Sequence, residues 1–155
     1  MAGVADILDL ASVRVRLSAT SKKMLFHHLA ILAAASVDGD AAAILQCLNA
    51  REKAGNTGYG GGVAIPHCRH EGLARVRGFF VRLAEPLDYG SVDGVPVDLV
   101  FLLLSPKDAG VSHLKALAAV SRLLRDPEMT GKLRGARSGD ALFALLTGDE
   151  ARDAA

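Results

Sequence analysis

VDLVFLLL, residues 97–104, is an almost unbroken apolar run with β-branched and aromatic members. A run of this length and composition is typical of a central strand that is covered on both faces. Residues 63–65 and 78–83 predict two further strands, and the alternation of apolar and basic residues over 13–17 predicts a strand with one buried face. These segments together indicate a β-sheet.

Helical periodicity precedes and follows these strands. Apolar residues recur at helical spacing over 24–35, with Thr20 as the expected N-cap, and Asp38-Gly39 ends that helix. The other predicted helices are one behind the cap Asp40, one over 111–125, one that starts at Asp126-Pro127 and one over 138–146. Strands with helices at both ends of one chain imply an α/β fold, and we expect a mixed β-sheet flanked by helices on both faces.

The whole chain is expected to form one domain. It has 155 residues, half of them hydrophobic, which is enough to bury a core of its own. The sequence contains no internal repeat, low-complexity segment or linker. We therefore expect a single domain over residues 1–155 with its core at about 13–147, strands kept apart by Pro86 and Pro96, and a frayed tail from Glu150.

Composition argues against several classes of protein. Lys and Arg number 18 against 17 Asp and Glu and are scattered, whereas nucleic-acid binders carry a concentrated basic patch. The two cysteines lack CxxC spacing and indicate a reducing compartment; we expect Cys47 to be a buried small hydrophobe and Cys68 to be more exposed. No secretory signal is visible, and the apolar runs are too short to span a bilayer. We expect a cytoplasmic protein that binds no nucleic acid and does not insert into a membrane.

The segment most informative about function is REKAGNTGYGGGVAIPH, residues 51–67. Backbone N–H groups of its glycine-rich loop, including that of Gly58, can converge on phosphate oxygens. Thr57 can add a hydroxyl donor, and Arg51 can supply positive charge. The loop lacks the GK[ST] ending of a nucleotide-binding P-loop, and a strand follows where a dinucleotide motif needs a helix. The pattern predicts an anion site around a nucleophile.

His67 is the candidate nucleophile. An imidazole with an ordinary pKa near ~6.5 is largely neutral at neutral pH and has one ring nitrogen free to attack. A phosphoryl group bound there would carry roughly −2 charge, which explains the need for donors nearby. The alternative is a packed or solvated histidine next to a surface turn, and the combination with Arg51 and Thr57 favours the chemical interpretation.

His113 is the second candidate, in the predicted first turn of the helix over 111–125, with Ser112 as a possible cap. A helix N-terminus favours an anion, so His113 could donate a hydrogen bond to a phosphoryl group on His67. The alternative is a polar residue near a cap. The spacing of His67, Cys68 and His70 matches no common zinc pattern, so we expect no metal and no cofactor. His27 and His28 are expected to have no chemical role.

Three stretches resemble one family. RExxGxTGxGxGVAIPH, PVDLVFLLLSP and SHLKALAAVSRLL are similar to the enzyme IIA domain of the phosphoenolpyruvate:sugar phosphotransferase system, of the fructose/mannitol type and nearest to its nitrogen-regulatory branch. The similarity covers about residues 13–146. It implies phosphorylation of His67 at Nε2, His113 as the second active-site histidine, Arg51 as the nearby basic residue and Thr57 as the loop hydroxyl. The chain departs from the family at Asn56, where Ser is frequent, and at Cys68, where Gly or Ala is usual.

The resemblance also implies partners. The phosphoryl donor would be the small carrier HPr or its nitrogen-branch homologue, and no metal or cofactor would be needed. Downstream, the protein would either regulate protein partners through its phosphorylation state or pass phosphate to the IIB domain of a sugar permease. A non-catalytic binding module is the third possibility. For docking, we expect His67 at the rim of a shallow apolar depression with Leu73, Val111 and Leu114.

Overall fold

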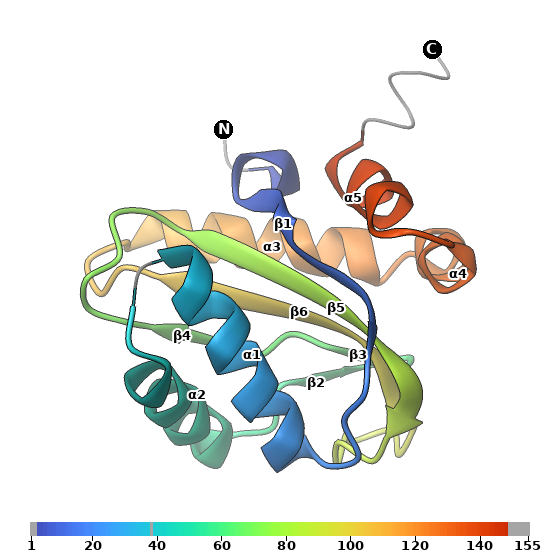
Figure 1. Cartoon of the computed structure of the whole chain (residues 1–155), viewed down its shortest axis with the longest axis horizontal. Helices are drawn as coiled ribbons and strands as arrows, with labels where there is room; N and C mark the ends of the chain where they lie inside the picture. The colour runs from blue at the N-terminus through green and yellow to red at the C-terminus, as the bar shows by residue number, and fades with distance from the viewer. Residues whose placement is uncertain (1–2, 38, 149–155) are drawn as a thin grey trace.

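The computed structural model describes residues 3–37 and 39–148. Its centre is a six-stranded sheet (Figure 1). The strands are β1 (Leu8–Leu17), β2 (Gly58–Gly60), β3 (Val63–Ala64), β4 (His67–Arg69), β5 (Arg77–Leu87) and β6 (Val97–Ser105). Their order is β1-β5-β6-β3-β2, and β4 also pairs with β6. The predicted strand at the centre of the sheet is therefore confirmed.

The pairing is mixed, as expected. β5 runs antiparallel to β6, whereas β3 and β4 both run parallel to β6 and follow one another along its edge. β1 is parallel to β5, and β2 is antiparallel to β3. In this register His67 lies opposite Leu103 and Arg69 lies opposite Ser105. The pairing with β6 thus fixes where the candidate nucleophile stands.

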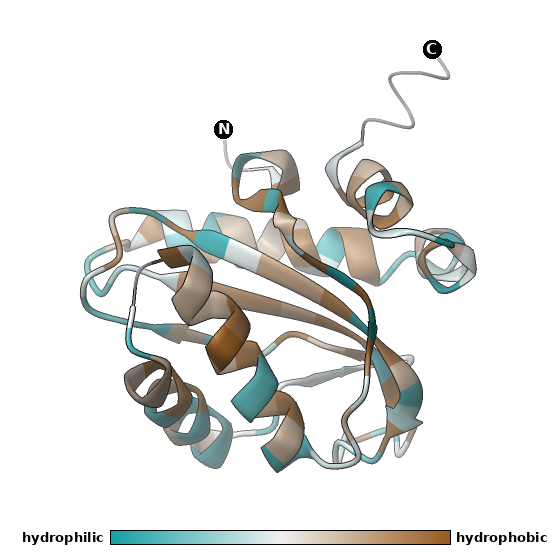
Figure 2. Cartoon of the chain, viewed as in Figure 1, coloured by the Kyte–Doolittle hydropathy of each residue, from teal (hydrophilic) through white to brown (hydrophobic). Residues whose placement is uncertain are grey.

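The side chains of β6 divide between two apolar clusters. Val100, Leu102 and Leu104 join the cluster beneath α1 (Lys22–Val37) and α2 (Ala41–Ala54). The alternate residues of the strand join the cluster beneath the helices of the opposite face: Leu99, Phe101 and Leu103. All six are fully buried, which is why the strand reads as a continuous apolar run, mostly brown in Figure 2.

Four helices cover the second face of the sheet. They are η1 (Val4–Asp6), α3 (Val111–Leu124), α4 (Pro127–Gly135) and α5 (Gly139–Thr147). The caps Asp40 and Asp126 accept hydrogen bonds from Ala42 N–H and Glu128 N–H, each at 3.0 Å, as the sequence predicts. Helices on both faces of a mixed sheet confirm the predicted fold class.

Some expected boundaries are wrong. The hydroxyl of Ser21, not Thr20, accepts from the first turn of α1, and Gly110 rather than Ser112 precedes α3. β5 continues through Pro86 to Leu87, and the register of its pairing with β6 shifts after Arg82; proline is tolerated in a strand at such an irregularity. Asp38 and the tail from Glu150 lie outside the described residues.

Candidate functional site

The fold brings the two candidate histidines together. His67 is the first residue of β4, and His113 lies in the first turn of α3, yet their ring centroids are 5.6 Å apart. β6 makes this possible, because Leu103 pairs with His67 while the hydroxyl of Ser105, two residues on, lies 2.5 Å from Nδ1 of His113. Two rings that are 46 positions apart in the sequence therefore lie side by side.

His67 is held in one tautomer. Its Nδ1 lies 2.8 Å from the backbone carbonyl oxygen of Ile65. A carbonyl can only accept, so Nδ1 carries the proton and Nε2 keeps its lone pair. Burial has the largest effect and lowers the pKa of His67. The Ile65 hydrogen bond opposes burial, and the positive charge of Arg51 adds a smaller lowering effect. The ring is thus kept neutral and is presented as a nucleophile at Nε2.

His113 is more deeply buried, with 6% of its surface exposed. Burial lowers its pKa to about 4, with help from the charge of Arg69. It is therefore neutral at neutral pH and has one N–H to donate. Its partner Ser105 is completely buried and was not singled out in the sequence. The sequence feature that could have identified Ser105 is its position at the end of the most apolar strand. A hydroxyl at such a position is expected to be buried, and a buried hydroxyl requires a hydrogen-bond partner.

Arg51 stands in the last turn of α2, close enough for its charge to affect His67. Its Nη1 donates to the carbonyl oxygen of Gly55 at 2.8 Å, which directs the guanidinium across the end of its own helix. The sequence placed Arg51 near His67, and the structure brings the two together. A role for Arg51 in balancing the charge of a phosphoryl group on His67 stays a prediction.

Glu52 organises the neighbouring backbone, a role the sequence did not reveal. Its carboxylate accepts from Thr57 N–H at 3.0 Å, from the Thr57 hydroxyl, and from Lys22 Nζ at 2.9 Å. Burial opposes ionisation of Glu52, but these hydrogen bonds and the Lys22 charge prevail and lower its pKa. The carboxylate thus joins the start of α1, the end of α2 and the loop before β2.

Thr57 and Gly58 face this carboxylate network in the structure. The Thr57 hydroxyl is 2.7 Å from the hydroxyl of Tyr89, and its backbone carbonyl accepts from Ile65 N–H at 3.0 Å. The N–H of Gly58 donates to the side-chain oxygen of Asn56 at 2.7 Å. Direct contacts from Thr57 and Gly58 to a phosphate therefore stay predictions. To make them, the Thr57 hydroxyl and the Gly58 N–H would have to give up the hydrogen bonds described here. What Thr57 does here is connect Glu52 to Ile65, whose carbonyl orients His67.

The glycine-rich stretch does not form one anion-binding loop. Gly60, Gly61 and Gly62 have positive φ angles and make the turn between β2 and β3, at the end of β3 away from His67. The N–H of Gly61 donates to the Asp93 carboxylate at 2.8 Å, so it is not directed at His67. The expectation that the loop's N–H groups converge on phosphate is wrong for this turn, whose position only strand pairing decides.

Apolar side chains border the histidine pair. Val111 and Leu114, in the same turn of α3 as His113, are 64% and 60% exposed, and Leu73 is half-buried. This exposure agrees with a docking surface beside the site, while its shape as a shallow depression stays a prediction. Among residues 3–37 and 39–148, no group of three or more His, Cys, Asp or Glu side chains is placed to hold a metal ion.

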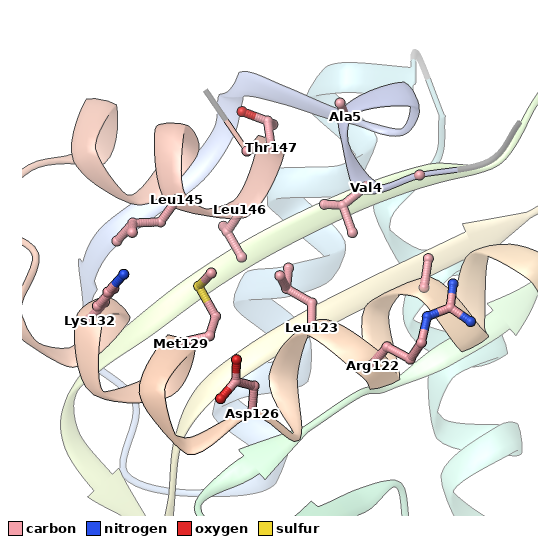
Figure 3. Close-up of a pocket in the computed structure, with 13 residues that line it drawn as sticks. Val4, Ala5, Arg122, Leu123, Asp126, Met129, Lys132, Leu145, Leu146 and Thr147 are labelled. Atoms are coloured by element: carbon pink, nitrogen blue, oxygen red, sulfur yellow. The ribbon is translucent and has the colours of Figure 1, made fainter. Parts of the chain in front are cut away.

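A second region of the molecule contains a pocket. A pocket of about 610 Å³ lies between η1 and helices α3, α4 and α5 (Figure 3). Val4, Leu123, Met129 and Leu146 point into it, and Arg122 and Lys132 stand at its border. Neither His67 nor His113 lines this pocket. In the described part of the chain, no helix is both long and apolar enough to cross a membrane.

Comparisons with known proteins agree with the geometry. A nitrogen regulatory protein of Bradyrhizobium diazoefficiens is 43% identical over 143 residues, which cover 92% of this chain and 94% of that protein. The crystal structure of the nitrogen regulatory protein IIA-Ntr from Neisseria meningitidis superposes with a TM-score of 0.88 at 36% identity, over 93% of this chain and 99% of that one. The mannitol IIA chain in the Escherichia coli complex with phosphorylated mannitol IIB shares the fold, with a TM-score of 0.77 at 17% identity over 92% of this chain and 99% of that one.

The sequence model of the family described as "Phosphoenolpyruvate-dependent sugar phosphotransferase system, EIIA 2" matches residues 6–148. That span includes every strand of the sheet, both histidines, Arg51 and the Glu52 network. The chain therefore belongs to the EIIA 2 family of the phosphoenolpyruvate-dependent sugar phosphotransferase system.

Proposed function

We propose that this protein is a cytoplasmic phosphoryl carrier that accepts a phosphoryl group on Nε2 of His67 and acts as a regulator in the nitrogen branch of the phosphotransferase system. The observation that carries the proposal is the hydrogen bond between Nδ1 of His67 and the Ile65 carbonyl, because it leaves Nε2 unprotonated. The donor is a phosphohistidine of HPr or its nitrogen-branch homologue. The nitrogen-regulatory relatives support the regulatory role.

The transfer is an in-line displacement at phosphorus. Nε2 of His67 attacks, the P–N bond to the donor imidazole breaks, and the donor ring leaves with the electron pair of that bond. The Nδ1 proton of His67 keeps the Ile65 carbonyl as its acceptor throughout. Because such a transition state is loose, the protein contributes mainly position and charge stabilisation.

Two groups, Arg51 and His113, serve the phosphoryl oxygens in this proposal. Arg51 contributes positive charge. The Ser105 hydroxyl donates to Nδ1 of His113, which leaves the Nε2–H of His113 to donate to a phosphoryl oxygen. Ser105 is thus a positioning residue, and no metal is required. Val111 and Leu114 provide apolar surface where the donor protein docks and excludes water.

The test is to incubate the chain with phosphoenolpyruvate labelled on phosphate, enzyme I and an HPr-type carrier, and to follow label on the protein. We expect one labelled histidine in the wild type and in His70→Ala, a control in the loop that follows β4. His67→Ala should take up no label. Full labelling of His67→Ala would exclude the proposal.

Transport is the second candidate, favoured by the shared fold with a mannitol IIA seen in complex with phosphorylated IIB. In that case label on His67 would pass to an added fructose- or mannitol-type IIB domain. A chain that remains labelled in the presence of IIB, and binds other proteins according to its phosphorylation state, would support regulation. Failure to accept phosphate from any HPr-type donor would instead support a non-catalytic binding module.

A further inference from the structure

The two cysteines of the chain meet beside the histidine site. Cys47 lies in α2 one turn before Arg51, and Cys68 follows His67 in β4. The thiol of Cys47 donates at 3.1 Å to the backbone carbonyl of Arg69, the residue after Cys68. Both cysteine side chains pack in the apolar cluster beneath α1 and α2. Both thiols are free. The two thiols are therefore neighbours where α2 packs against β4.

The two thiols differ in reactivity, in the opposite sense to the sequence expectation. Cys47 is half-exposed, and its pKa is lowered by the hydrogen bond from Cys68 and the charge of Lys107, against the effect of burial. Cys68 is only 5% exposed, and the bond to Cys47 together with burial raises its pKa. An accessible thiol with a lowered pKa next to a second thiol is the arrangement typical of redox-sensitive proteins.

We propose that Cys47 and Cys68 form a reversible disulfide on exposure to a peroxide, and that this bond slows phosphoryl transfer at His67. The first part concerns the thiols alone. The second part rests on the function proposed above.

The chemistry balances with one peroxide. The Cys47 thiolate attacks one oxygen of hydrogen peroxide, the O–O bond breaks, and Cys47 becomes a sulfenic acid while hydroxide leaves and takes up a proton as water. The Cys68 sulfur then attacks the Cys47 sulfur, its thiol proton joins the departing hydroxide, and a second water leaves. Two thiols are oxidised, and one peroxide is reduced. Reduction by a dithiol reverses the bond by exchange.

The effect on the site follows from where the bond acts. Disulfide formation brings the two sulfur atoms to bonding distance. It therefore joins α2 to β4 by a covalent bond and shifts the two elements relative to one another. Arg51 lies one turn further along α2, and Cys68 is the residue after His67. A shift of about 1 Å between reacting and stabilising groups can cost ~100-fold in rate, so we expect transfer to the oxidised protein to be about 10- to 100-fold slower.

The first measurement needs no phosphoryl donor. Full-length protein is treated with hydrogen peroxide, unfolded and reacted with a thiol label, and its mass is determined. We expect loss of both labelled thiols, a mass lower by two hydrogen atoms and full recovery with dithiothreitol. Cys68→Ala should stop at the sulfenic acid of Cys47, detectable with dimedone. Cys47→Ser, whose hydroxyl can still donate to the Arg69 carbonyl, should give no disulfide.

The second measurement compares phosphoryl uptake by the reduced and oxidised forms. Wild type should slow on oxidation and recover on reduction, while Cys47→Ser should transfer at the reduced rate under both conditions. Persistence of two free thiols, or a disulfide that leaves the rate unchanged, would overturn the proposal. If reduced protein accepts no phosphoryl group, the carrier function fails, whereas the thiol readout still decides whether the disulfide forms.

Discussion

The two ends of α3 border two very different sites. Its first turn places His113 against His67, where Val111 and Leu114 are exposed around the ring pair. Its later turns place Leu123 along a pocket of about 610 Å³ whose lining contains no histidine or cysteine. A carrier that exchanges its group with other proteins needs an accessible nucleophile on an open surface. Under the function proposed above, the pocket does not mark the reactive site, and the tautomer of His67 does.

The largest expected difference between the two ends comes from His113→Ala. Removal of one preorganised donor to a developing anion typically costs about 10²- to 10³-fold in rate, and we expect a loss of that order in phosphoryl uptake at His67. Rapid-quench measurement with a phosphorylated HPr-type donor provides the rate. Ser105→Ala should lower the rate less, by about 10-fold, because the His113 ring stays but loses its orienting partner. An unchanged rate in His113→Ala would remove the distinction between the two ends.

Glu52→Gln tests whether the hydrogen bonds of Glu52 affect the rate of phosphoryl uptake as strongly as the two histidines do. The amide cannot accept from Lys22 and Thr57 as the carboxylate does, so we expect stability to fall by about 1–3 kcal/mol and uptake to slow by about 10-fold. Urea unfolding and the uptake assay measure the two effects. The matched control is Glu128→Gln. Glu128 is exposed, and its ion pair with Lys132 is long at 3.9 Å, so this substitution should change neither the stability nor the uptake rate. Equal effects in both variants would argue against a positioning role for Glu52.

Lowering the pH should reduce the stability of the folded protein through protonation of His113. His113 has a pKa of about 4 in the folded protein and near ~6.5 in the unfolded chain. Between these values the unfolded chain binds the proton first, so the stabilisation is present above about pH 6.5 and is lost as the pH falls towards 4, by on the order of 1–3 kcal/mol. Urea unfolding across this range measures it. His113→Gln should flatten that part of the curve, and an unaltered slope would contradict the assignment.

The smallest effect is expected at the pocket. Met129→Ala enlarges a hollow that already exists, so a stability loss of about 1–2 kcal/mol should leave the rate of phosphoryl uptake within about twofold of wild type. Thermal unfolding and the uptake assay are run on the same preparation. A loss of uptake comparable to that of His113→Ala would show that the far end of α3 is coupled to the site, and the comparison above would fail.

The sequence did best in locating individual candidate side chains, whose chemical roles stay predictions. The sequence singled out His67, His113 and Arg51, and the structure brings all three into one site. It did less well with supporting groups: Glu52, Ser105 and Tyr89 received no role, because their importance lies in hydrogen bonds to residues distant in the chain. The glycine-rich stretch misled for a related reason. Positive φ angles make glycine suitable for both an anion site and a hairpin turn, and only the pairing of β3 with β6 decides between them.

The sequence by itself determined the central strand and the helix caps at Asp40 and Asp126, because each follows from local periodicity or capping. It also singled out His67 as the candidate nucleophile, which stays a prediction. Only the tertiary structure decided which nitrogen of His67 is free, which partner orients His113 and which cysteine is exposed. These properties depend on atoms that strand pairing and helix packing bring within hydrogen-bonding distance. No local pattern in the chain carries that information, since the contacts exist only after β4, β6 and α3 have assembled.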